Sequence, residues 1–114
     1  MKLNHINLTV TDVSETVKFL EKYFGLQSQG GNKGMAFLYD DDGLVLSLMK
    51  ASRDTEVKYP DTFHIGFGQE SEKQVNEINQ RLRDDGFNVE PPQRHHAWTF
   101  YVQAPGGFTV EVLA

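Results

Sequence analysis

Residues 3–26 read LNHINLTVTDVSETVKFLEKYFGL, and the hydrophobic periodicity of this stretch changes halfway along it. From His5 to Val10, polar and apolar residues alternate, as in a β-strand with one buried face. After Asp12, a typical N-cap residue, apolar residues recur every three or four positions until Gly25, a typical helix end. The stretch therefore predicts a strand followed by an amphipathic helix, with His5 on the polar face of the strand.

The same pattern begins again in the second half of the chain. Residues 62–69 (TFHIGFGQ) resemble a strand, and residues 71–87 (SEKQVNEINQRLRDDGF) have helical spacing. Three further short strands are predicted after each helix, over about 26–30, 34–40 and 43–50 in the first copy and 87–92, 97–103 and 108–114 in the second. The chain is therefore an internal repeat of one βαβββ unit.

This repeat predicts an α+β fold built from two tandem βαβββ modules. Module 1 spans about residues 1–50, module 2 spans about 61–114, and the polar, proline-containing residues 51–60 form a linker. At 114 residues the chain is long enough for one domain with a core and too short for two ordinary ones. We therefore predict a single domain over residues 1–114.

The composition narrows the choice of partners and cofactors. The formal net charge of −5 disfavours nucleic-acid binding, which needs a basic surface. No apolar run approaches the about 20 residues of a membrane helix, and the start does not read as a signal peptide, so we expect a cytoplasmic protein without a membrane partner. The chain has no cysteine, so any metal ion must be held by His, Asp and Glu.

Four polar residues occupy equivalent strand positions in the two copies. Aligning the copies pairs His5 with His64 and Ser47 with Glu111, all on the faces opposite to the apolar residues. A single strand histidine is more often a packed residue, but matched histidines, with Glu111 inside a valine run, favour a shared role. Two histidines and one carboxylate can hold Fe(II), Mn(II), Ni(II) or Zn(II) with coordination positions left open.

A second pair of histidines precedes the predicted strand at 97–103. Residues 93–98, QRHHAW, contain His95 and His96. They could be exposed loop residues, which is the commoner case. The alternative is that they lie at the rim of the site, where an imidazole such as that of His96 can transfer a proton near neutral pH.

These stretches together resemble the vicinal oxygen chelate superfamily, which includes glyoxalase I, extradiol dioxygenases, fosfomycin-resistance transferases and bleomycin-binding proteins. The resemblance rests on residues 3–26, on FHIGFG at 63–68 and on FYVQAPGGFTVEVL at 100–113, and it spans essentially the whole chain. It implies cupped mixed sheets with the helices on the convex side, around a divalent metal ion.

The resemblance also implies roles for individual residues. It assigns the metal ligands to His5, His64 and Glu111. Ser47 occupies the position of a fourth ligand in members like glyoxalase I, and a short neutral serine is not expected to bind the metal directly. Tyr101 matches a tyrosine that fosfomycin-modifying enzymes and extradiol dioxygenases use near the metal, although it could also be a core or edge aromatic residue.

Two functions follow from the resemblance. The first is a metal-dependent lyase, transferase or dioxygenase that acts on a small oxygen-bearing substrate by Lewis-acid catalysis. The alternative is a metal-free protein that binds a drug or other small molecule, for which the net charge of −5 suits a cationic ligand. In small members the modules pair across two chains, which implies a homodimer with His5 from one chain and His64 and Glu111 from the other.

Overall fold

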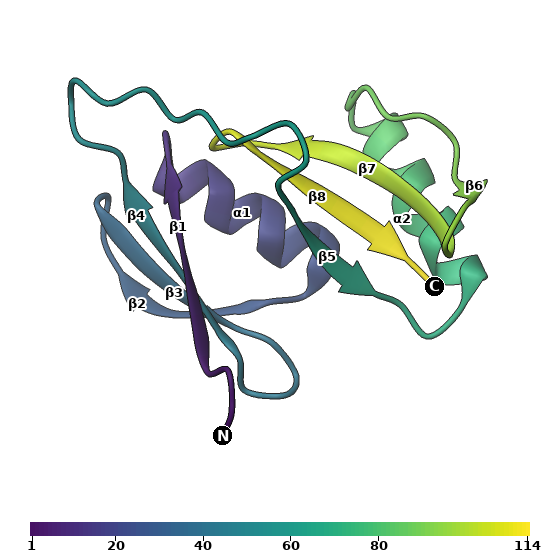
Figure 1. Cartoon of the computed structure of the whole chain (residues 1–114), viewed down its shortest axis with the longest axis horizontal. Helices are drawn as coiled ribbons and strands as arrows, with labels where there is room; N and C mark the ends of the chain where they lie inside the picture. Colours follow the sequence, from purple (N-terminus) through teal and green to yellow (C-terminus); the bar gives the residue numbers. More distant parts are fainter. The chain divides into compact units, whose positions relative to one another are not determined.

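The computed structural model describes residues 1–114, and it contains the two predicted βαβββ modules (Figure 1). The elements of the first module are β1 (His5–Val10), α1 (Val13–Phe24), β2 (Gln27–Gly31), β3 (Met35–Tyr39) and β4 (Val45–Lys50). Those of the second are β5 (His64–Gly68), α2 (Glu72–Asp84), β6 (Gln93–Arg94), β7 (Trp98–Ala104) and β8 (Phe108–Leu113). The predicted α+β class is confirmed. Neither helix is long and apolar enough to cross a membrane.

Both modules form a four-stranded mixed sheet with the same connectivity. The strand order is β1-β4-β3-β2 in the first sheet and β5-β8-β7-β6 in the second. In each, the first strand runs parallel to the last one, so that Asn7 lies opposite Ser47 and Gly66 opposite Glu111. The register therefore places Ser47 and Glu111 at equivalent positions of the two sheets, as the sequence alignment predicts.

The chain divides into two compact units whose boundaries cross the modules. Unit 1 contains residues 1–59 together with 104–108, and unit 2 contains residues 60–103 and 109–114. The turn between β7 and β8, with the adjoining strand ends Ala104 and Phe108, therefore belongs to unit 1, whereas the rest of both strands belongs to unit 2. Nothing in the repeat predicts this exchange.

In unit 1, α1 has the predicted ends and buries one stripe of side chains. The Asp12 carboxylate accepts a hydrogen bond from the Glu15 amide, and Gly25 ends the helix in the left-handed conformation with φ of 66°. The stripe consists of Val13, Thr16, Phe19, Leu20 and Tyr23. Core residues of the sheet include Leu8, Val10, Leu38 and Leu48, all at most 1% exposed. Burial of this apolar surface drives the folding of the unit.

The segment 104–108 is bound to α1 and β1 through polar contacts. The Thr16 Oγ1 atom lies 3.0 Å from the Pro105 carbonyl oxygen, and the Thr11 amide donates to the Gly106 carbonyl at 3.1 Å. Gly106 has φ of +101°, and a Cβ there would lie 2.5 Å from Thr16 Oγ1 and 3.0 Å from Val10 Cβ. Only glycine fits this position.

The free edge of β1 is covered by a side chain from residues 51–60. The Tyr59 hydroxyl accepts a hydrogen bond from the Thr9 amide at 2.9 Å and donates one to the Thr9 carbonyl at 2.8 Å. Both backbone groups of an edge residue are thereby paired.

We expect Tyr59→Phe to lower the free energy of unfolding by about 1–2 kcal/mol, because it removes both of these hydrogen bonds. Urea unfolding monitored by circular dichroism measures the change. Tyr39→Phe is the matched control, since the Tyr39 hydroxyl makes no hydrogen bond in the structure. Equal stability of the two variants would show that Tyr59 does not stabilise the edge.

In unit 2, the predicted helix stripe is confirmed, and one predicted strand is wrong. Val75, Ile78 and Leu82 are buried on α2, and Ser71 caps the helix at the Gln74 amide. Residues 87–92, predicted as a strand, form no strand, and β6 is limited to Gln93–Arg94. The two prolines in this segment lack amide hydrogens, and the Asn79 side chain donates to the Glu90 carbonyl at 2.8 Å, which holds the segment by a bond outside any sheet.

Candidate functional site

Glu111 is the centre of a polar cluster on β8. It is 4% exposed, whereas its neighbours Val110 and Val112 are fully buried on the opposite face of the strand. The Glu111 Oε2 atom accepts hydrogen bonds from Thr99 Oγ1 at 2.6 Å and from His96 Nε2 at 2.7 Å. Two donors on one oxygen fix the orientation of the carboxylate.

His64 approaches the other oxygen of Glu111. Its Nδ1 lies 2.9 Å from the Thr62 carbonyl oxygen, and because a carbonyl can only accept, Nδ1 carries a hydrogen. In neutral His64 the Nε2 atom therefore has a free lone pair, and it lies 3.3 Å from Glu111 Oε1. Two electron-pair donors that face each other at this distance are suited to share a proton or a cation.

The same cluster holds Glu111 in its ionised form. Burial alone raises the pKa of Glu111, but hydrogen bonds from Thr99 and His96, the charge of His96 and a hydrogen bond from Tyr101 outweigh it, and the pKa lies below its ordinary value. An ionised carboxylate is the form that can bind a metal ion.

Tyr101 lies beside His64 on the same face of the sheet. The two rings meet edge to face, with centroids 5.6 Å apart and planes at 87°. Burial, the negative charge of Glu111 and hydrogen bonding to Glu111 raise the pKa of the Tyr101 phenol. Tyr101 therefore keeps its proton at neutral pH and is suited to donate a hydrogen bond.

We expect Thr99→Val to raise the pKa of Glu111, because the substitution removes a hydrogen bond to the charged form. The lowered pKa means that ionised Glu111 stabilises the fold above its unfolded-state pKa, and this contribution is lost as the pH falls through the folded-state pKa. In Thr99→Val the folded-state pKa of Glu111 should lie closer to its unfolded-state pKa, so the pH range over which this stabilisation is lost should be narrower. Carboxyl-carbon NMR titration of chelator-treated protein measures the pKa.

Thr109→Val is the matched control for Thr99→Val. Thr109 lies on β8, the strand of Glu111, but its hydroxyl accepts a hydrogen bond from Gln103 Nε2 at 2.7 Å and does not contact Glu111. It should leave the pKa of Glu111 unchanged. Identical titration of Glu111 in the two variants would contradict the assigned role of Thr99.

In unit 1, the predicted ligand His5 has different surroundings from Ser47, which occupies the fourth-ligand position and is not expected to bind the metal. His5 is exposed at the start of β1, and its Nδ1 lies 2.6 Å from the Asn4 side-chain oxygen. Ser47 is 8% exposed, and its hydroxyl donates to the Asn7 side-chain oxygen at 2.8 Å. Ser47 is thus engaged with Asn7, whereas the His5 ring is accessible.

The structure separates the two histidines of QRHHAW. His96 contacts Glu111, whereas His95 contributes its amide to a backbone bond with the Ala97 carbonyl at 2.9 Å. Sequence reasoning missed Thr99, which donates the shortest hydrogen bond to Glu111. Thr99 lies two residues before Tyr101 on a predicted strand, and residues two apart on a strand share one face. This spacing could have identified Thr99 from the sequence.

We tested whether these residues fit a divalent metal ion. No group of three or more His, Asp or Glu side chains in the structure forms a ready-made metal site. Unit 2 does supply a pair of possible ligand atoms, His64 Nε2 and Glu111 Oε1, which are 3.3 Å apart. Two atoms that each lie about 2.0–2.2 Å from the same ion are about 3 Å from each other, so the observed separation is close to that of two ligands. Gly66 lies opposite Glu111, and a Cβ there would be 3.9 Å from Oε1, so the glycine keeps a further side chain away from this oxygen. The pair fits two ligands of an ion.

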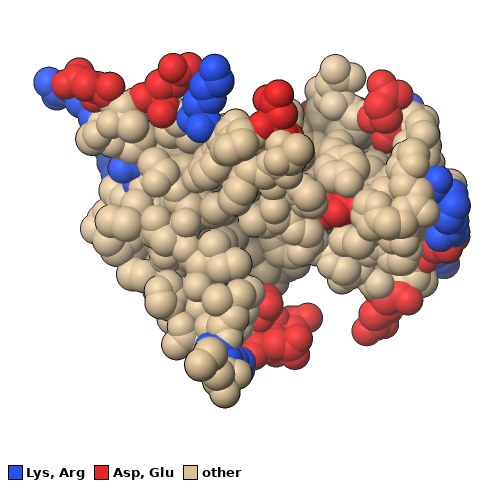
Figure 2. Space-filling model, viewed as in Figure 1, with Lys and Arg blue, Asp and Glu red and all other residues tan.

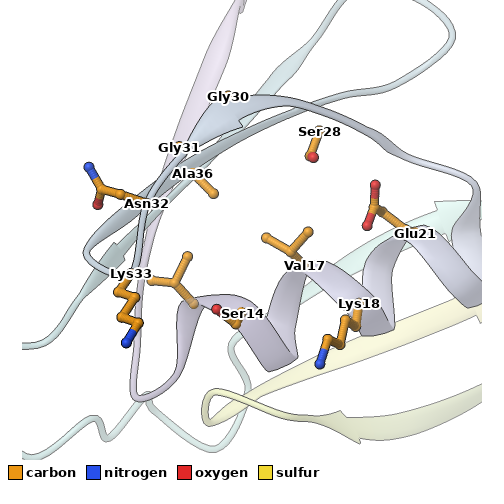
Figure 3. Close-up of a pocket in the computed structure, with 11 residues that line it drawn as sticks. Ser14, Val17, Lys18, Glu21, Ser28, Gly30, Gly31, Asn32, Lys33 and Ala36 are labelled. Atoms are coloured by element: carbon orange, nitrogen blue, oxygen red, sulfur yellow. The ribbon is translucent and has the colours of Figure 1, made fainter.

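A separate cavity of about 460 Å³ lies in unit 1 between α1 and the hairpin of β2 and β3 (Figure 3). Val17 of the helix and Ala36 of β3 face each other across it. Its rim includes Lys18, Glu21 and Lys33. The lining contains no histidine, so this cavity is not the place of the predicted metal chemistry.

Charged side chains lie in several groups on the face that Figure 2 shows. In Figure 2, Asp and Glu are visible as several separate groups rather than as one continuous patch. The net charge of −5 is therefore spread over several surface positions.

Three solved structures illustrate which proteins the chain resembles. A possible glyoxalase from Bacillus cereus is 56% identical over 100% of this chain and 99% of its own, with a TM-score of 0.93. A lactoylglutathione lyase from Agrobacterium tumefaciens is 18% identical over 98% and 92%, with a TM-score of 0.77. A variant of the fosfomycin resistance protein FosX from Listeria monocytogenes, complexed with Mn(II) and 1S,2S-dihydroxypropylphosphonic acid, is 22% identical over 99% and 91%, with a TM-score of 0.81. The last two share the fold.

The comparison with protein families covers nearly the entire chain. No curated protein sequence matches it. The family model of the Glyoxalase/Bleomycin resistance protein/Dioxygenase superfamily matches residues 2–112, which include both repeats and every predicted site residue. The chain therefore belongs to the Glyoxalase/Bleomycin resistance protein/Dioxygenase superfamily.

Proposed function

We propose that this protein is a metal-dependent enzyme that acts on a small oxygen-bearing substrate by Lewis-acid catalysis. The observation that carries the proposal is the pair of atoms His64 Nε2 and Glu111 Oε1, 3.3 Å apart, with the His64 tautomer set by the Thr62 carbonyl. Imidazole and carboxylate suit Mn, Fe, Ni or Zn. The Mn(II) in the FosX complex supports a divalent ion in a protein of this fold.

In this proposal the side chains have distinct tasks. His64 and Glu111 hold the ion, with His5 as the third ligand. When bound, the ion supplies a Lewis acid that polarises an oxygen of the substrate. His96 and Thr99 hold Glu111 Oε2, which leaves Oε1 for the ion.

Two further residues serve the substrate rather than the ion. Tyr101, which keeps its proton, exchanges its hydrogen bond to Glu111 for one to the substrate oxygen. The His96 side chain is 56% exposed while its Nε2 contacts Glu111, so His96 can exchange a proton between the site and solvent.

Elemental analysis of protein purified without chelator tests the metal. We expect one transition-metal ion per site. Protein that contains no metal, and binds none after reconstitution with Mn(II), Fe(II), Ni(II) or Zn(II), would overturn the proposal. That result would favour the alternative, a metal-free protein that binds a drug or another small molecule.

We also propose that the protein is a homodimer with two equivalent sites. His5 of one protomer joins His64 and Glu111 of the other in each site. His5→Ala and Glu111→Ala proteins, each defective alone, should regain metal binding when they are unfolded and refolded together. In the resulting heterodimer both substitutions fall in one site, and the other site has all its ligands. A mixture that binds no more metal than the separate variants would show that each site forms within one chain.

A further inference from the structure

A cavity of about 280 Å³ in unit 2 adjoins His64. It is lined by Asp61, Thr62, Phe63, His64, Tyr101 and Thr109. This volume is close to the lower end of the range of about 300–1,000 Å³ that is typical of ligand pockets. The cavity therefore has room for a single ring with one substituent.

The walls of this cavity are aromatic, and two of its lining residues, Tyr101 and Thr62, contact the His64 ring. Phe63 and Tyr101 supply two rings, and the His64 ring stands edge to face with Tyr101. Thr62 supplies the carbonyl that accepts the hydrogen bond from His64 Nδ1. A molecule in the cavity thus lies directly beside the imidazole that faces Glu111.

The charge of the lining has a single sign. No lysine or arginine borders the cavity, and its one carboxylate is that of Asp61, which is exposed and forms no ion pair in the structure. In the metal-free protein, a phosphate, phosphonate or carboxylate group would face the Asp61 carboxylate without a counter-ion, whereas an amine pairs with Asp61 and lies against the aromatic rings.

We propose that this cavity binds an aromatic ring that carries a cationic amine, and that it discriminates against anionic groups. If the bound molecule is the substrate, the inference rests on the proposed function: His64 is then a metal ligand, and the part of the substrate that extends beyond the ion occupies the cavity. As a statement about binding, it depends only on the lining.

Three probes of similar size and different charge test the inference on chelator-treated protein: benzylamine, benzyl alcohol and benzylphosphonate. NMR titration follows the aromatic signals of His64, Tyr101 and Phe63 at pH 7. We expect benzylamine to shift these signals saturably and to bind most tightly, and benzylphosphonate to bind most weakly. If benzylphosphonate binds in this cavity as tightly as benzylamine, or if benzylamine leaves the three rings unperturbed, the inference is wrong.

Two variants that lose the same charge separate the local effect of the Asp61 carboxylate from the effect of the protein's net charge. Asp61→Asn should weaken benzylamine binding by about threefold to fivefold, the upper part of the range for an exposed ion pair, and leave benzyl alcohol binding unchanged. Asp54→Asn removes the same charge from a residue outside the cavity and should change neither. Equal benzylamine affinity in the Asp61 and Asp54 variants would overturn the assignment of Asp61.

The same proteins distinguish a failure of this inference from a failure of the metal proposal. Asp61→Asn should bind metal as the wild type does, because Asp61 is not a ligand. Wild-type protein that binds metal but not benzylamine would refute the cavity inference alone. Protein that binds benzylamine at His64 but no metal would refute the metal proposal and leave the cavity inference standing.

Discussion

His64→Ala is expected to weaken the binding of Mn(II) or Zn(II) by more than about 100-fold, since loss of a residue that only supports a ligand already costs about 10–100-fold. The substitution removes Nε2, one of the two atoms that unit 2 presents at 3.3 Å separation. Because the His64 side chain is 40% exposed, its loss opens no cavity in the core. Isothermal titration of metal into chelator-treated protein measures the affinity.

Two substitutions serve as controls for this result. Ser47→Ala removes a hydroxyl that is bonded to Asn7, and His95→Ala removes an imidazole that does not contact Glu111. Both should leave the metal affinity nearly unchanged. Indistinguishable titration curves for wild-type and His64→Ala protein would eliminate His64 as a ligand.

Gly106→Ala is expected to destabilise the protein by about 3 kcal/mol or more, the sum of backbone strain and overpacking. The residue has φ of +101°, and its new Cβ would lie 2.5 Å from Thr16 Oγ1 and 3.0 Å from Val10 Cβ. Thr16 and Val10 are both 0% exposed, so neither can move without disturbing the core of unit 1. Thermal and urea unfolding measure the loss.

Gly86→Ala separates the two contributions. Gly86 has a similar φ of +93°, but nothing lies within 4 Å of the position of its Cβ. This variant should lose only about 1–2 kcal/mol, the cost of a left-handed conformation for a non-glycine residue. Both substitutions lower the conformational entropy of the unfolded chain by the same amount, so this effect cancels when the two variants are compared. Equal destabilisation would mean that the contact with Thr16 is unimportant.

The fold was predictable wherever local signals and burial agree. The caps at Asp12 and Gly25 and the buried stripe of Val75, Ile78 and Leu82 on α2 follow from residue type and spacing, and the structure confirms them. The alternation around Glu111 also predicts its face, because a strand has a period of two.

What the sequence did not predict depends on contacts between distant residues. The bond from Asn79 to Glu90 replaces the expected strand at 87–92, and the hydrogen bond from Thr99 identifies which oxygen of Glu111 is restrained. The cavity beside His64 arises where residues 61–64 meet Tyr101 and Thr109. Such contacts are set by tertiary packing, which leaves no trace in local periodicity.

The bond between Thr16 and Pro105 has a consequence for folding during synthesis, because 89 residues separate its two partners. The ribosome makes helix α1 early, but the segment that covers buried Thr16 emerges only after most of unit 2 has been made. Closing so long a loop is slow and entropically costly. We therefore expect unit 1 of a nascent chain to remain open to proteases, and to become resistant only once residues 104–108 have left the exit tunnel.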